Sequence, residues 1–440
     1  MEEYLSVRAN DSITEVSRFQ IRISFLIQES PLKMKNLISL ETIQSAYPAV
    51  KSIVHHTPMT SCTNLTEKCG LQPGQLLLKM ENLQRTGSFK IRGAYHRISS
   101  LSEAEKAAGV VAASAGNHAQ GVALASKLIG IRSTVFMPEF ASIAKIQATR
   151  KYGAEVVLEG KNFDEAVSAA KEFASKKGLI FISAYDDDGI ITGQGTLGLE
   201  IIEDAPDIET ILICVGGGGL FSGVASVIRR LAPKAKIIGI QAAGAPSAVE
   251  SWKAGRLVPR GETNTIADGV AIKSPSERTF QYIQEFADEM ATVEDSEIAR
   301  AMLMMLERAK MVVEPAGAVG VAALLSGKVK VTGKTVVTVS GGNVDVKFLA
   351  DLIEREMINA KRYMHFFSSV PDKPGGLAAL LDRIAEFKGN IITVNHNRIS
   401  PSVPLGQTGV ELLLEVRDQD HITRISEGLR SLSYRVEMLD

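Results

Sequence analysis

One stretch decides the fold class: residues 211–223 read ILICVGGGGLFSG, an apolar run that turns into four glycines. Such a run is typical of a strand buried on both faces of a parallel sheet. Because each glycine loses much backbone entropy on folding, we expect the four to have a purpose. Consecutive glycine amides at a helix start can encircle a phosphate, with the helix dipole assisting. The stretch therefore predicts a strand, a phosphate-binding turn and a helix.

The motif does not fit a nucleotide. It lacks the Lys-Ser/Thr pair of a triphosphate-binding loop, and the next predicted strand ends at Gln241 without the acidic residue of a dinucleotide site. The sequence therefore favours a cofactor with a single phosphate.

The same strand-to-helix pattern is repeated from about residue 40, where short strand-like runs alternate with helix-length segments. This pattern predicts an α/β fold with open, twisted, mostly parallel sheets. Because ligands of such sheets bind beyond the carboxyl ends of the strands, candidate site residues are expected directly after each run. The predicted strands are Gln75–Met80, Val110–Ala113, Thr134–Met137, Glu155–Leu158, Leu179–Ser183, Thr210–Val215, Lys236–Gln241 and Thr335–Val339.

Two further strand ends carry polar groups. Residues 113–120 read ASAGNHAQ, where Ser114 and Asn117 can cap a helix and still face a ligand, while Gly116 allows close backbone approach. The alternative is a plain helix cap with His118 as a satisfied helix histidine. Residues 339–343 read VSGGN, and the neutral hydroxyl of Ser340 can donate to an aromatic nitrogen without protonating it.

One lysine stands in a glycine-bracketed turn, since residues 87–94 read GSFKIRGA. Between Phe89 and Ile91, Lys90 is drawn toward apolar surroundings, where loss of hydration favours the neutral amine. A neutral amine can attack an aldehyde and form a Schiff base. The alternative is an ordinary lysine whose stem packs on the core while its head reaches water.

Composition limits the class of partner. The 440 residues are 45% hydrophobic and 22% charged, which indicates two or three globular domains. With 49 basic and 50 acidic residues the net charge is -1, so we expect small-molecule partners, with no nucleic acid and no membrane. The cysteines, Cys62, Cys69 and Cys214, have neither metal nor redox spacing, which favours a reducing, cytoplasmic location. The first 33 residues resemble neither a signal nor a transit peptide, and Met34 is an alternative start.

Taken together, these motifs resemble those of one enzyme family. From about Thr57 to Lys347 the chain resembles the pyridoxal-phosphate enzymes of the tryptophan-synthase-β fold (fold type II) and, within them, the L-threonine dehydratases (threonine ammonia-lyases). Residues 81–94, ENLQRTGSFKIRGA, resemble the dehydratase form of the lysine motif, and residues 114–120, 216–220 and 340–343 resemble the carboxylate, phosphate and ring-nitrogen motifs. The chain lacks the lead residues typical of cysteine synthases, which favours elimination over sulfide addition.

The resemblance implies a role for each motif. Lys90 is the expected catalytic residue, which carries pyridoxal 5'-phosphate and removes the Cα proton. The expected cofactor-binding residues are Lys90, Phe89, Asn117, Gly216, Gly217, Gly218, Gly219 and Ser340. Asn117 is expected to contact the ring hydroxyl and Ser340 the ring nitrogen. The substrate carboxylate is expected to bind Ser114, Gly116, Asn117 and His118, mainly through backbone amides.

Some residues depart from related enzymes. Serine racemases and some dehydratases use acidic residues for a divalent cation where this chain has Gln241 and Ser247, so we expect no metal site, although the Ala245 carbonyl could bind a monovalent ion. Ala115 stands where serine racemases carry a second serine. Glu314 matches a family motif near the cofactor, and the alternative for it is a dipole partner at a helix start.

The pattern changes after Asp351. Strands Tyr363–Val370, Asn390–Arg398, Val410–Val416 and Tyr434–Leu439 and helices Gly375–Lys388 and His421–Arg430 give the order β-α-β-β-α-β. With PDKPGGL at residues 371–377, this segment resembles the amino-acid-sensing ACT domains, which are ferredoxin-like. The alternative is a dimerisation module that binds nothing. Because about eighty residues bury little alone, we expect a homo-oligomer, a dimer or tetramer.

The sequence thus predicts an extension at residues 1–33, a catalytic domain at 34–360 with a smaller subdomain near 87–187, and an ACT-like regulatory domain at 361–440. The expected reaction converts L-threonine to 2-oxobutanoate and ammonia, and L-serine to pyruvate, under allosteric control by an amino-acid effector. The alternatives are a serine racemase, a serine-preferring dehydratase, and a non-catalytic amino-acid sensor of the same fold.

Overall fold

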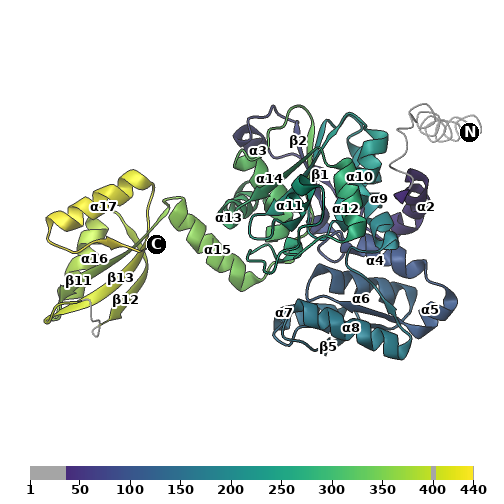
Figure 1. The fold of residues 1–440 in the computed structure, drawn as a ribbon. Helices are drawn as coiled ribbons and strands as arrows, with labels where there is room; N and C mark the ends of the chain where they lie inside the picture. Colours follow the sequence, from purple (N-terminus) through teal and green to yellow (C-terminus); the bar gives the residue numbers. More distant parts are fainter. Residues whose placement is uncertain (1–35, 398–402, 440) are drawn as a thin grey trace, which may run out of the picture. The chain divides into compact units, whose positions relative to one another are not determined.

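The computed structural model describes residues 36–397 and 403–439, so the predicted extension at residues 1–33 and Met34 lie outside it. The chain divides into two compact units, Met1–Val344 and Asp345–Asp440, which Figure 1 colours from purple to green and from green to yellow. Within the described residues, no helix has both the length and the apolar character that a membrane crossing needs.

The larger sheet of the first unit has six strands in the order β1-β2-β10-β7-β8-β9. All neighbours are parallel except β1 and β2. Because β2, β7 and β10 are parallel and in register, their carboxyl ends lie at one edge of the sheet. The strands are β1 Met59–Thr60, β2 Leu76–Met80, β7 Thr210–Cys214, β8 Lys236–Ala242, β9 Glu289–Val293 and β10 Thr335–Val339.

A second, wholly parallel sheet has the order β5-β4-β3-β6. Its strands are β3 Val110–Ala113, β4 Ser133–Met137, β5 Glu155–Leu158 and β6 Ile180–Phe181, and Figure 1 shows α6, α7 and α8 around it. Val111 and Ala113 pack toward α8, while Val110 and Ala112 pack toward α4 and α6. Alternate residues are therefore buried on opposite faces, which explains the uninterrupted apolar run of β3.

The helices of the first unit connect and cover these strands. They are α2 Leu40–Lys51, α3 Thr63–Lys68, α4 Lys90–Ser99, α5 Glu103–Ala108, α6 Asn117–Ile129, α7 Ile143–Lys151, α8 Phe163–Lys177, α9 Asp188–Asp204, α10 Gly219–Leu231, α11 Ser247–Ala254, α12 Glu277–Phe286, α13 Asp295–Met304 and α14 Pro315–Leu325. Three short turns are η2 Glu81–Leu83, η3 Asp268–Val270 and η4 Met305–Ala309.

All eight strands predicted for this unit are present, with shifts of up to two residues at their ends. The prediction missed β1 and β9. β1 has two residues, too few for a pattern, and β9 reads EMATV, in which only Met290 and Val293 are buried. This edge strand lacks a strong apolar pattern, because only two of its five side chains are buried.

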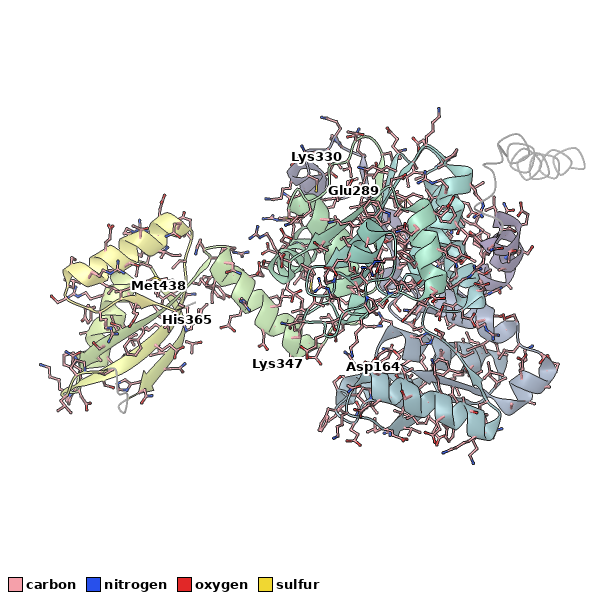
Figure 2. The ribbon with its side chains drawn as sticks, viewed as in Figure 1. Asp164, Glu289, Lys330, Lys347, His365 and Met438 are labelled. Atoms are coloured by element: carbon pink, nitrogen blue, oxygen red, sulfur yellow. The ribbon has the colours of Figure 1, made fainter. Side chains whose placement is uncertain are left out.

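The second unit has the elements in the predicted order. They are α15 Val346–Asn359, β11 Tyr363–Pro371, α16 Gly376–Glu386, β12 Asn390–Asn397, β13 Gln407–Glu415, α17 Gln419–Ser431 and β14 Glu437–Met438. The sheet is antiparallel in the order β12-β13-β11-β14, and His365 and Met438, labelled in Figure 2, stand on its neighbouring strands β11 and β14. The predicted strand end at Arg398 lies outside the described residues. Contacts group α15 with this unit, sixteen residues before the predicted boundary at 360.

Candidate active site

The lysine turn and the VSGGN turn are joined through their backbones. The amide of Phe89 donates to the carbonyl of Ser340 at 3.2 Å, and the amide of Gly342 donates to the carbonyl of Gly87 at 2.9 Å. Ser88 and Gly341 form an isolated antiparallel bridge between them. Backbone hydrogen bonds therefore join two turns, about 250 residues apart in sequence, at the carboxyl edge of the larger sheet.

Lys90 is the first residue of α4, and its Nζ donates to the carbonyl oxygen of Ala184 at 3.0 Å. The same Nζ lies 5.1 Å from the ring centroid of Phe89. Burial lowers the pKa of Lys90 to about 8, although Cys214 and Glu314 act in the opposite direction. Loss of hydration therefore favours the neutral amine more than in an exposed lysine, as the apolar neighbours of Lys90 predicted.

A buried ion network holds α4 from the side. Arg92, which is 0% exposed, donates to both carboxylate oxygens of Glu81 at 2.8 Å and to those of Glu200 at 2.7 and 2.9 Å. Lys79 lies 3.2 Å from Glu200 and 2.8 Å from Asp204. Arg92 thereby ties the first turn of α4 to both η2, which directly follows β2, and α9, which fixes the helix start at Lys90.

The four glycines form the turn between β7 and α10. A Cβ on Gly216 would lie 2.9 Å from the Gly269 carbonyl oxygen, one on Gly217 would collide with the ring of Tyr185, and one on Gly218 would lie 2.7 Å from Thr279. Gly218 also has a φ of 93°, which favours glycine. Tight packing therefore accounts for part of the glycine requirement that the sequence attributed to a ligand.

The turn also offers unused donors. Within residues 36–397 and 403–439, the amides of Gly216, Gly217 and Gly218 have no recorded protein acceptor, and α10 begins at Gly219. Free amides at a helix N-terminus are the groups that bind phosphate. The geometry of this turn fits the phosphate of pyridoxal 5'-phosphate.

Sequence reasoning missed the segment after β6. Ala184 holds Lys90 through its carbonyl, and Tyr185 packs over the glycine turn. The sequence did contain a signal for this segment. Residues 179–183 were predicted as a strand, and site residues were expected directly after each predicted strand. Ala184 acts through a backbone atom, which no residue type reveals, and Tyr185 resembles any aromatic core residue.

Asn117 does not cap α6, so that prediction is wrong. The N-cap is Gly116, which has no side chain, and Asn117 is the first helical residue. The Asn117 side chain instead donates through Nδ2 to Glu314 Oε1 at 2.7 Å and accepts at Oδ1 from Asn343 Nδ2 at 2.8 Å. These contacts turn it toward the VSGGN turn, away from its own helix end.

Glu314 precedes α14 as its N-cap residue, but its side chain makes no capping hydrogen bond. Burial raises its pKa to about 7, against the lowering effects of Asn117, Lys145 and Lys90. The carboxyl stands at the start of α14, where the helix dipole can act on it as the alternative supposed, and its Oε1 also accepts from Asn117 Nδ2.

The predicted carboxylate loop shows two internal contacts. His118 is buried, its Nε2 lies 3.0 Å from the Ile182 carbonyl oxygen, and burial together with Lys90 lowers its pKa to about 3. Its side chain is thus a neutral, satisfied helix histidine, and only its backbone amide is available to a carboxylate. Ser114 Oγ accepts from the amide of Gly116 at 3.1 Å, so this amide already has a partner.

Ser340 lies at the end of β10 and is 2% exposed. Its Oγ is 3.5 Å from the Ala316 carbonyl oxygen, a long and therefore weak contact, and its side chain is also hydrogen-bonded to Cys214. Beside it, burial raises the pKa of the Cys214 thiol to about 11. Ser340 and Cys214 therefore present neutral groups at the carboxyl ends of β10 and β7.

The residues that replace the acidic cation ligands are used structurally. Gln241 Oε1 accepts from the amides of Ala248 and Val249 at 3.0 and 3.2 Å, and Ser247 Oγ donates to the Ile272 carbonyl. Gln241 therefore caps the start of α11. No group of three or more His, Cys, Asp or Glu side chains suited to a metal occurs among the described residues.

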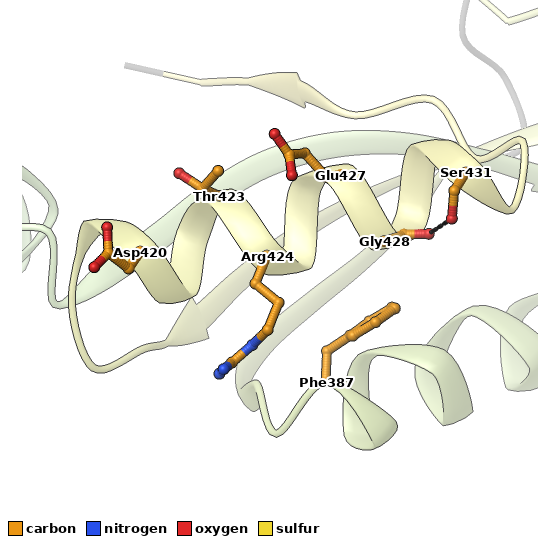
Figure 3. Close-up of a pocket in the computed structure, with 7 residues that line it drawn as sticks. All are labelled: Phe387, Asp420, Thr423, Arg424, Glu427, Gly428 and Ser431. Atoms are coloured by element: carbon orange, nitrogen blue, oxygen red, sulfur yellow. Dashed lines mark hydrogen bonds between the residues drawn. The ribbon is translucent and has the colours of Figure 1, made fainter.

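A pocket of about 620 Å³ lies along α17 in the second unit (Figure 3). Figure 3 shows Arg424 extending toward the side on which Phe387 lies. The charges three or four residues apart along the helix form the pattern of a solvated helix face. The lining residues are Phe387, Asp420, Thr423, Arg424, Glu427, Gly428 and Ser431.

The comparisons with known proteins agree on one family. Residues 50–342 match the model of the pyridoxal-phosphate dependent enzymes. The chain is 46% identical to an L-threonine ammonia-lyase of Thermotoga maritima over 404 residues, which cover 92% of this chain and all of that protein.

Solved structures give the same result. A threonine deaminase of Solanum lycopersicum superposes with a TM-score of 0.68 at 36% identity, covering 75% of this chain and 91% of that one. A maize serine racemase superposes with a TM-score of 0.68 at 33% identity, covering 73% and 98%. The fold is thus an α/β fold of type II with parallel and mixed sheets, and the chain belongs to the family of pyridoxal-phosphate-dependent enzymes.

Proposed function

We propose that this protein dehydrates and deaminates L-threonine to 2-oxobutanoate and ammonia, and converts L-serine to pyruvate in the same way. The observation that carries the proposal is the position of Lys90, a lysine with a lowered pKa at the edge where the predicted motif turns meet. The relatives named as L-threonine ammonia-lyase and threonine deaminase support this substrate.

We assign the cofactor contacts to the predicted residues. Lys90 holds the aldehyde carbon, the amides of Gly216 to Gly219 bind the phosphate, Phe89 packs beside the ring, Asn117 meets the ring hydroxyl and Ser340 the ring nitrogen. The free amides of the glycine turn and the weakly bonded hydroxyl of Ser340 fit these roles. When bound, pyridoxal 5'-phosphate supplies an electron sink for charge that develops at Cα of the amino acid.

Residues of the protein move the proton and hold the substrate. Lys90 takes the Cα proton, since its neutral amine is available near pH 8. Amides at the start of α6, with Ser114, hold the substrate carboxylate near the positive end of the helix. Ser340, a neutral donor, would hydrogen-bond the ring nitrogen without protonating it. Loss of the Cα proton and the β-hydroxyl as water leaves an enamine, which tautomerises to an imine, and hydrolysis of the imine gives the 2-oxo acid and ammonia.

The test is direct. Purified protein incubated with L-threonine should release 2-oxobutanoate, and Lys90→Ala should abolish the release. Borohydride should fix the cofactor covalently on Lys90, as peptide mapping would establish. A label on another lysine would overturn the assignment of Lys90, and no 2-oxo acid from threonine or serine would overturn the proposed reaction.

For the second unit we propose a ferredoxin-like, ACT-like regulatory domain that binds an amino-acid effector. The element order and the antiparallel sheet β12-β13-β11-β14 support this reading. We further propose a homo-oligomer in the cytoplasm, a catalytic domain at 34–360 and a regulatory domain at 361–440. A response of the activity to branched-chain amino acids would support the regulatory role.

A further inference from the structure

A chain of side-chain hydrogen bonds links three of the turns around Lys90. Asn343 Nδ2 donates to the Thr86 carbonyl at 2.7 Å and to Asn117 Oδ1 at 2.8 Å, and Asn117 Nδ2 donates to Glu314 Oε1 at 2.7 Å. A primary amide nitrogen has two hydrogens, so both of those on Asn343 are used. One hydrogen of Asn117 Nδ2 is used by Glu314, and one remains.

This chain gives the Asn117 amide a single favourable orientation. If the amide were rotated by half a turn, its NH₂ would face the NH₂ of Asn343, and its oxygen would face the Glu314 carboxylate. Both contacts would bring like partial charges together. The hydrogen bond from Asn117 Nδ2 to Glu314 Oε1, at 2.7 Å, therefore holds the amide in this orientation from one side, and Asn343 holds it from the other.

Burial of the Glu314 carboxyl costs solvation free energy. No ion pair is recorded for Glu314 among the described residues, and burial disfavours its charged form. Its position is constrained on the other side as well, because a Cβ on Gly341 would collide with Glu314 Oε1. Its own amide donates to the Gly341 carbonyl at 3.1 Å, which ties it to the turn that contains Ser340.

We propose that Glu314 is a positioning residue that fixes the amide of Asn117, so that the remaining Nδ2–H stays directed at the cofactor ring hydroxyl. The proposal rests on the cofactor contact assigned to Asn117 in the proposed function. Glu314 itself needs no contact with substrate. Its role requires an acceptor oxygen at this position, which glutamine also supplies and alanine does not.

The first readout is the visible absorbance of the holoenzyme, which needs no substrate. Glu314→Ala should shift the absorbance band and lower kcat/KM about tenfold to hundredfold, the range expected when a buried donor is left without its acceptor. Glu314→Gln should keep the wild-type band and lose at most a few-fold in kcat/KM. Asn117→Ala should give the shifted band too, and the double variant Glu314→Ala/Asn117→Ala should resemble Asn117→Ala alone.

The chain offers a matched control. Glu356, a buried glutamate of the second unit, accepts at Oε1 from Asn359 Nδ2 at 2.8 Å, so it repeats the same contact. Glu356→Ala should leave the band unchanged. If Glu314→Ala fails to fold, Glu314→Met removes the acceptor at similar volume and takes its place.

Three results would overturn the proposal: a wild-type band in a folded Glu314→Ala or Glu314→Met, equal impairment in Glu314→Gln, or additive losses in the double variant. If the wild type fails to act on threonine but the band shifts as described, the proposed substrate is wrong and the role of Glu314 stands.

Discussion

Replacing Arg92 by leucine should destabilise the first unit strongly. Arg92 makes two bidentate pairs, with Glu81 and Glu200, and the side chains of all three residues are 0% exposed. Removing the guanidinium leaves two buried carboxylates, with Lys79 near only one of them. Removal of one partner from a buried ion pair costs about 3–5 kcal/mol.

This magnitude predicts a measurable shift in melting temperature. An unfolding entropy of about 2.1 cal/mol/K per residue over roughly 300 residues means that 3–5 kcal/mol lowers Tm by about 5–8 °C. Calorimetry of wild type and Arg92→Leu at pH 7 would measure it. Arg383→Leu is the control, because Arg383 pairs with Glu386 on an exposed helix surface, where a salt bridge contributes about 0–1 kcal/mol.

The pH dependence has a definite sign. Burial acts to raise the pKa of Glu81, but Arg92 and Thr57 hold it below its usual value. In the wild type this contribution to stability is therefore present at neutral pH and is lost as pH falls through the folded pKa. In Arg92→Leu burial acts without Arg92, the pKa of Glu81 rises, and acid favours the folded variant. The Tm difference should shrink between pH 7 and pH 5; a constant or growing difference, or equal Tm values at pH 7, would refute this reasoning.

Three further outcomes are expected. Tyr185→Ala should weaken cofactor binding in an absorbance titration, because the ring packs over the glycine turn, and an unchanged dissociation constant would contradict that role. With Ala115 lacking a transferable proton, L-serine should give pyruvate without racemisation, so D-serine accumulating at a comparable rate in chiral chromatography would show another proton donor. Truncation after Val344, where the two units divide, should keep the dehydratase activity and lose any response to amino-acid effectors; a folded, cofactor-loaded and inactive truncation would argue against that division.

Local patterns in the sequence predicted most of the fold. Short apolar or β-branched runs predicted the eight strands of the first unit, because burial on both faces of a sheet demands continuous apolar residues. Several of these runs also lead into glycine or serine. The edge strand β9 has neither property and was missed. The glycine turn and Ser340 were found for the same reason, since each lies directly beyond a predicted strand. Lys90 was found from the glycines that bracket its turn and from its apolar neighbours.

The contacts between those turns needed the tertiary structure. The sequence alone determined the α/β class, eight strands of the first unit, the β-α-β-β-α-β order of the second and the residue types available at the strand ends, because periodicity and turn composition are local. It did not determine that Asn117 turns away from its helix to Glu314, that Ala184 holds Lys90, or that Arg92 joins Glu81 to Glu200 across 119 residues of sequence. Those pairings depend on which turns meet at one sheet edge, and only the packed fold brings groups so distant in sequence within hydrogen-bond distance.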